Sequence, residues 1–208
     1  MRRFSVHPVN PQRRLMQQAA DLMRSGGLVA MPTDACYVLA CHLGDKAAVD
    51  RLRLIRGVDD KHLLTLMCRD LSELAQYAQV DNRQYRFLKE WTPGAYTFIL
   101  PATKEVPRRL MHPSRKTVGL RVPASPTVQA LLEELGEPVL CSTLILPGET
   151  EPLTDPQDIE HRLAKLVDLM IEGEPGRHEM TTMIDMTGEE PMVERAGLGA
   201  IDQMTLAR

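Results

Sequence analysis

The sequence predicts a single α/β domain. Segments with helical spacing of apolar residues alternate with short apolar runs, and no linker divides the chain. A length of 208 residues with 43% apolar content is enough for one sizeable core. No apolar run approaches the ~18 residues of a membrane span, and residues 1–8 lack the apolar region of a signal peptide. We therefore expect a cytoplasmic protein without a membrane partner.

The elements of the first half are predicted from caps, apolar spacing and turn residues. Asn10 and Pro11 begin a first helix, which ends before Gly26. A strand follows at Leu28–Met31, and Asp45 caps a second helix. The other predicted elements are a strand at Leu63–Met67, helices at Leu71–Ala78 and Gln84–Trp91, and a strand at Tyr96–Leu100.

The second half continues this alternation. Thr117–Val122 alternates between apolar and polar residues and ends at Pro123, so it predicts a strand. Ser125 and Asp155 each precede a proline and are the predicted caps of two further helices. The remaining predicted strands are Val139–Ile145, Val167–Ile171 and Thr182–Met186. The chain after Met192 is weakly patterned, and the strand order of the sheet is not predicted.

The cysteines indicate a reducing compartment. The four are Cys36, Cys41, Cys68 and Cys141, and no pair has the two-residue spacing of a zinc site. We expect buried, reduced thiols that serve packing. A metal cluster of Cys36, Cys41 and His42 is the alternative.

Candidate ligand-binding residues gather in loops and at strand ends. Thr33, Asp34 and Tyr37 follow the first strand, where open α/β sheets bind their ligands. The alternative is an ordinary corner in which Thr33 and Asp34 bond their own backbone. Further hydroxyl and cationic side chains at such positions are Arg56, Lys61, Thr97, Arg121, Ser142, Thr143 and Thr181. This set is poor in general bases and suits an anionic ligand such as a nucleotide, although no glycine-rich phosphate loop is present.

Charge is distributed unevenly along the chain. A formal net charge of -3 argues against a protein that coats nucleic acid by bulk charge. Between Pro101 and Arg121, however, Glu105 alone opposes six basic residues: Lys104, Arg108, Arg109, Arg115, Lys116 and Arg121. This basic segment is a candidate RNA-binding face, and a solvated loop is the alternative.

Four ordered motifs resemble those of the YrdC/YciO family. They are Pro32-Thr33-Asp34 with Tyr37, Pro93-Gly94 with Thr97, Gly119–Pro123 and Thr181–Asp185. The resemblance covers roughly the whole chain. It implies a YrdC-like twisted open sheet with flanking helices around a deep, positively lined concave cavity.

The resemblance also implies a function. It implies kinship with the L-threonylcarbamoyladenylate (threonylcarbamoyl-AMP) synthases. These enzymes are nucleotidyltransferases that combine ATP, L-threonine and bicarbonate for the threonylcarbamoyladenosine modification of tRNA. ATP and Mg²⁺ are thus implied, and double-stranded RNA binding is a second implied property. Residue by residue, it places Thr33 and Tyr37 near the threonine or adenylate. Thr97 and Arg121 fall in the cavity wall. Thr181 and Arg195 match a family serine and a late arginine near the nucleotide. The implied mechanism is positional, and no side chain is singled out as catalytic.

Two motifs depart from the synthases on the nucleotide side. Where synthases carry Lys-x-Arg-Pro, this chain reads Arg56 to Asp59 with Val58 at the second cation, and where they carry Ser-Ala-Asn it reads Thr143-Leu144-Ile145. An uncompensated loss of an arginine and an amide costs ~3–6 kcal/mol, or roughly a hundred- to ten-thousand-fold. Lys61 is the candidate substitute.

Two hypotheses follow from these departures. The first is a synthase-like enzyme whose activity is weak or redirected. The second is a noncatalytic protein that binds double-stranded RNA or tRNA through its basic residues.

Overall fold

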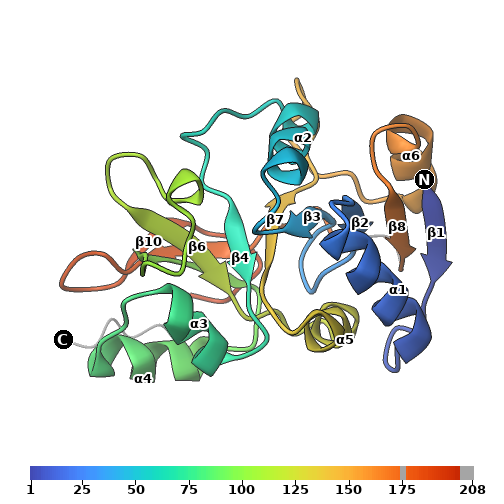
Figure 1. Cartoon of the computed structure of the whole chain (residues 1–208). Coiled ribbons are helices and arrows are strands. Elements are labelled where there is room, and N and C mark those ends of the chain that lie inside the picture. The colour runs from blue at the N-terminus through green and yellow to red at the C-terminus, as the bar shows by residue number, and fades with distance from the viewer. Residues whose placement is uncertain (174–176, 202–208) are drawn as a thin grey trace.

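The computed structural model describes residues 1–173 and 177–201. Its strands are β1 (Arg2–Ser5), β2 (Val29–Met31), β3 (Val38–His42), β4 (Thr65–Met67), β5 (Tyr96–Pro101), β6 (Thr117–Arg121), β7 (Val139–Thr143), β8 (Leu169–Glu172), β9 (Thr182–Asp185) and β10 (Met192–Arg195). The helices are α1 (Arg13–Arg24), α2 (Lys46–Arg56), α3 (Leu71–Tyr77), α4 (Asn82–Trp91), α5 (Pro126–Leu135), α6 (Pro156–Leu163) and the 3₁₀ turn η1 (Arg108–Leu110). Within the described residues all ten strands form one sheet in the order β1-β8-β2-β3-β7-β4-β6-β5-β9-β10 (Figure 1). The predicted α/β class and open twisted sheet are confirmed.

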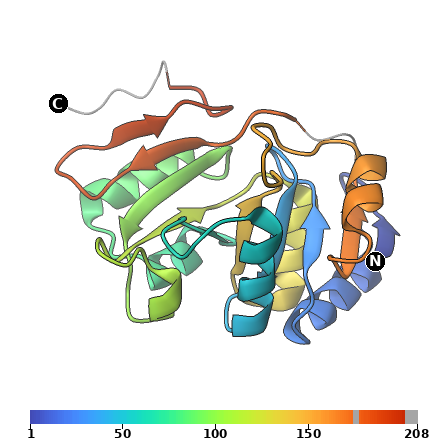
Figure 2. The ribbon, with the colours of Figure 1, turned by 90° about the horizontal axis from the view of Figure 1, so that it is seen from above.

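Helices cover both faces of this mixed sheet. α1 and α5 pack together over one face of the β8-β2-β3-β7 region, where Met16, Met23 and Leu131 meet Val29 and Val139. α2 and α6 belong to a second core that also takes in α3 and α4 (Figure 1). Figure 2 shows β9 and β10 running along one side of the molecule, far from β1. None of the helices in the described ranges has the length and apolarity of a membrane-spanning segment.

Most predicted caps are confirmed. The side chains of Asp45, Ser125 and Asp155 accept hydrogen bonds from the first turns of α2, α5 and α6. Gly57 and Gly136 end α2 and α5 in the left-handed conformation, which a glycine adopts without steric cost.

Two predicted helix starts are wrong. α1 begins at Arg13 instead of Pro11, because the imidazole of His7 accepts the N–H groups of Val9 and Asn10 and holds them in a separate turn. α4 begins at Asn82, two residues before Gln84. Asp81 and Gln84 form a reciprocal capping box there, in which each side chain accepts the other's backbone N–H.

Three strands are absent from the prediction. β3 is central, pairs antiparallel with β2 and β7, and is buried over Val38–Cys41. β1 and β10 form the two edges, where mostly exposed residues give no alternating apolar signal. Strand β7 ends at Thr143, two residues before the predicted end.

All four cysteines are buried and free, as predicted. Burial raises the pKa of Cys41 and that of Cys141 to about 12. Within the described ranges, no three His, Cys, Asp or Glu side chains are grouped to hold a metal ion.

Candidate anion-binding site

A pocket of about 270 Å³ opens where several strand ends meet. Strand β3 enters it at Val38 and β7 reaches it at Thr143, while α2 contributes its last residue and β10 its last residue. Its polar lining is Arg56, His62, Thr65, Thr97, Arg121, Ser142, Thr143, Thr181 and Arg195. The remaining wall is largely apolar and includes Leu63, Ile145, Met180 and Met183.

Arg56 is presented to the pocket by the end of α2. Gly57 stops the helix with φ 63°, so the chain turns away directly after Arg56. The guanidinium Nε of Arg56 donates to the hydroxyl of Ser142 on β7 at 3.0 Å, and both side chains are buried. Burial lowers the pKa of Arg56, because a buried cation loses hydration.

Arg121 enters from the end of β6 and is held from outside the pocket. Its Nη2 donates to the carboxylate of Asp34, whose other oxygen accepts the N–H of Ala124 at 2.9 Å. The Nε of Arg121 is buried and has no hydrogen-bond partner among the described residues. The pair therefore orients the guanidinium and leaves one donor unused.

Arg195, the last residue of β10, supplies the third guanidinium of the pocket. An irregularity in the pairing of β10 with β9 falls between Val193 and Arg195, and bulges of this kind re-aim a side chain. The Nη2 of Arg195 donates to the carbonyl of Thr181 at 3.0 Å. Its Nε is also buried and without a partner in the described part of the chain. A buried donor left unpaired costs about 1–3 kcal/mol, so two of them in one pocket indicate an acceptor ligand.

The pocket is positively charged. Three guanidinium groups line it, and no carboxylate from residues 1–173 or 177–201 does. Burial lowers the pKa of Arg195 as it does that of Arg56. A bound anion would offset this desolvation. Five hydroxyl groups add neutral hydrogen-bonding capacity, with Thr97 and Thr181 sharing an Oγ–Oγ hydrogen bond of 2.8 Å.

Comparisons of sequence and structure relate this chain to known proteins. A family model named for the Sua5, YciO and YrdC proteins, with the description "Telomere recombination", matches residues 21–197. The chain belongs to the Sua5/YciO/YrdC family.

Several relatives in this family are similar over nearly the whole chain. Protein YciO of Escherichia coli (strain K12) is 52% identical over 198 residues, which is 95% of this chain and 96% of that protein. The crystal structure of E. coli YciO matches with a TM-score of 0.93 at 51% identity, covering 97% and 98% of the two chains. A threonylcarbamoyl-AMP synthase of Vibrio vulnificus (strain YJ016) is 29% identical over 180 residues, covering 84% and 95%. The structure of P. abyssi Sua5 complexed with L-threonine matches with a TM-score of 0.86 at 25% identity, covering 95% of this chain and 58% of that one.

The structure brings together seven of the ten nucleotide-site residues predicted from the sequence. These are Arg56, Thr97, Arg121, Ser142, Thr143, Thr181 and Arg195. Their approach depends on pairings between strands distant in the sequence, such as β5 with β9.

Thr33, Tyr37 and Lys61 lie outside this lining. Thr33 donates to the carbonyl of Cys36 at 2.8 Å and accepts from Ala35, in the local arrangement given as the alternative, and it lines a neighbouring hollow of about 380 Å³. Tyr37 is fully buried, and its hydroxyl accepts the N–H of Gly173 at 3.1 Å. Lys61 is exposed.

The residue next to Lys61 is the one that reaches the pocket. His62 lines it together with Leu63, and neither is among the predicted residues. The sequence signal that could have identified them is the same as for Lys61, namely a position in the loop directly after the Arg56 motif.

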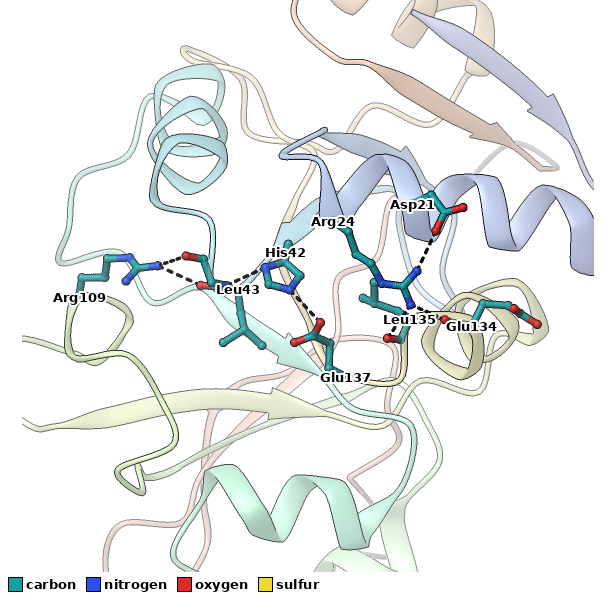
Figure 3. A network of polar contacts seen from close by, with 9 residues as sticks. Asp21, Arg24, His42, Leu43, Arg109, Glu134, Leu135 and Glu137 are labelled. Atoms are coloured by element: carbon teal, nitrogen blue, oxygen red, sulfur yellow. Dashed lines mark hydrogen bonds and ion pairs between the residues drawn. The ribbon is translucent and has the colours of Figure 1, made fainter.

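Apart from Arg121, the five basic residues of the segment between Pro101 and Arg121 also lie outside the pocket. Arg109 donates to the carbonyls of Leu43 and Gly44. Figure 3 shows Leu43 beside His42, at the end of β3 away from the pocket. Arg115 lies 3.7 Å from the carboxylate of Asp185, and Lys116 donates to the carbonyl of Pro113. Lys104 and Arg108 are exposed on the same connection between β5 and β6. The five residues thus form a surface separate from the three pocket arginines.

The network around His42 is structural. His42 Nε2 lies 2.8 Å from Glu137, and its Nδ1 accepts the N–H of Gly44 (Figure 3). Arg24 donates to the carbonyls of Glu134 and Leu135 at the end of α5. These contacts tie α1, α5 and β3 together at the end of β3 opposite the pocket.

The pocket does not fit a magnesium ion held by the protein. Mg²⁺ is usually bound through one or two carboxylates together with substrate phosphates. The described lining supplies hydroxyl groups and guanidinium groups but no carboxylate. Phosphate oxygens are therefore the ligands that would bring Mg²⁺ to this site.

Proposed function

We propose that this protein is a nucleotidyltransferase of the threonylcarbamoyl-AMP synthase type, with activity that is weak or redirected to a related substrate. The observation that carries the proposal is that the buried Nε–H groups of Arg121 and Arg195 have no partner among the described residues, in a pocket that Arg56 also lines. Guanidinium groups with free N–H donors are well suited to phosphate oxygens. A family relative named threonylcarbamoyl-AMP synthase supports the reaction class.

In this proposal the side chains act by position. The arginines hold the phosphates of ATP, and those phosphates would supply the oxygen ligands for Mg²⁺. The hydroxyls of Thr97, Thr143 and Thr181 orient the reacting carboxyl group against the α-phosphorus. L-threonine is proposed as the second substrate because a Sua5 structure that matches this fold is described as complexed with it.

The same pocket supports the proposal of reduced or redirected activity. Ile145 lines the pocket at the position where synthases carry an amide, and Leu144 is fully buried in the core. Neither side chain can bond to a phosphate. Lys61, the candidate substitute for the second cation, is exposed and outside the lining.

The link to tRNA and a cytoplasmic location are part of this proposal. Four free cysteines agree with a reducing compartment. RNA binding is not proposed as a second function, because Arg109, Arg115 and Lys116 have intramolecular partners.

The test is to incubate the protein with ATP, Mg²⁺, L-threonine and bicarbonate and to measure threonylcarbamoyl-AMP by mass spectrometry together with pyrophosphate release. We expect slow product formation that Arg195→Gln abolishes and that Arg13→Gln, at an exposed surface pair, leaves unchanged. Turnover at the rate of a dedicated synthase measured in parallel would contradict reduced activity. A protein that neither forms product nor binds ATP would refute the whole proposal.

A further inference from the structure

We propose that His62 is a phosphate-contacting residue of this pocket and that it takes up a proton when the ligand binds. The inference rests on the proposed function, because it requires a phosphate compound in the pocket. It assigns to a histidine part of the task that a second cation performs in the synthase motif.

The loop between α2 and β4 holds His62 at the pocket rim. Its backbone N–H donates to the carbonyl and carboxylate of Asp59, at 3.3 and 3.2 Å. Its carbonyl accepts from the guanidinium of Arg53 at 3.3 Å, and Arg53 also donates to the carbonyl of Asp59. The backbone is thus fixed from both sides, while the imidazole lines the same pocket as Arg56 and Arg195.

The charges that face His62 are mostly positive. Arg53 and Arg56 belong to α2, Arg195 to β10, and Asp59 to the loop of His62 itself. Desolvation lowers the pKa of His62, and the arginines lower it further, while Asp59 acts in the opposite direction. These effects favour the neutral imidazole in the free protein, beside cations that have no carboxylate in the described lining.

An anion in the pocket reverses this balance. A phosphate close to the imidazole favours its charged form, so the pKa of His62 is higher in the complex than in the free protein. Between those two values, binding takes up a proton and the affinity falls as the pH rises. The imidazolium offers two N–H donors and a positive charge, and it lies on the loop where Val58 has replaced a family arginine.

The experiment is calorimetric titration of AMP and of pyrophosphate at pH 6.5 in buffers of different ionisation enthalpy, which gives the protons taken up per ligand. Phosphate oxygens also titrate near this pH, so the difference between variants is decisive. We expect His62→Gln to take up fewer protons per ligand than the unmodified protein and to bind about tenfold more weakly, through loss of one charge-assisted hydrogen bond. His62→Lys should recover the affinity without the uptake. His161→Gln, on the exposed side of α6, is the control and should match the unmodified protein.

Each outcome has a defined meaning. AMP binding with the same proton uptake in His62→Gln as in the unmodified protein would overturn the inference and leave the proposed function standing. Failure of both AMP and pyrophosphate to bind would overturn the proposed function, and the inference with it. Should His62→Gln fold poorly, NMR titration of the native His62 ring decides. A rise in its pKa on adding AMP supports the inference, and an unchanged value overturns it.

Discussion

Replacement of Arg121 by methionine should destabilise the protein strongly, because it leaves the carboxylate of Asp34 without its cation. The two side chains are 4% and 14% exposed, and the described contacts leave Asp34 only the N–H of Ala124. Removing one member of a buried ion pair costs about 3–5 kcal/mol. We expect Arg121→Met to lower the free energy of unfolding by about that amount, measured by urea denaturation followed by circular dichroism.

A double-mutant cycle tests this reasoning. In Asp34→Asn/Arg121→Met both charges of the pair are removed, so most of the loss should be recovered, to within about 1–2 kcal/mol of the unmodified protein. Arg13→Met is the control, because Arg13 is 87% exposed in its pair with Glu134 and such a pair contributes at most about 1 kcal/mol. The account of this pair would be refuted if Arg121→Met lowered the free energy of unfolding by less than the control does. It would also be refuted if the double variant lost more stability than the two single variants together.

Three further predictions concern packing, capping and thiol chemistry. Gly199→Val should lower the melting temperature and weaken ATP binding, because a Cβ there lies 2.3 Å from the ring of Tyr96 and displaces the segment that follows Arg195. An unchanged melting temperature would contradict this. Ser125→Ala should cost about 1 kcal/mol in urea denaturation through loss of the α5 cap, whereas Asn10→Ala, outside α1, should cost little; equal losses would contradict the cap assignment. The four buried cysteines should react with a thiol reagent at pH 8 only after unfolding, because burial raises their pKa; rapid native labelling would be the contrary result.

Local signals predicted much of the fold. Caps such as Ser125 and Asp155 act within one helical turn, so their effect is visible in the sequence itself. Strand β3 was missed for a different reason. The residues Val38–Cys41 form a short apolar run directly after polar residues that suggested a ligand loop, and their strand character comes from pairing with β7, a hundred residues further along the chain.

In the candidate site, too, some positions follow from local signals and others depend on distant packing. Arg56 and Arg121 stand at the ends of elements that the sequence predicts, so their placement follows once those elements are correct. The direction of a side chain at a loop corner depends on distant packing. Tyr37 therefore points into the core, and His62 rather than Lys61 lines the pocket. Neither outcome could be read from spacing alone.

The most direct test of the central claim compares AMP with adenosine as ligands for the unmodified protein and for Arg195→Gln by calorimetric titration. The two ligands differ only in the phosphate, so their difference isolates the anion site. A charge-assisted hydrogen bond contributes about 1.5–3 kcal/mol, and we therefore predict that AMP binds roughly ten- to a hundred-fold more tightly than adenosine. Most of this preference should disappear in Arg195→Gln. Equal affinity for AMP and adenosine, or a preference that Arg195→Gln leaves intact, would contradict the account.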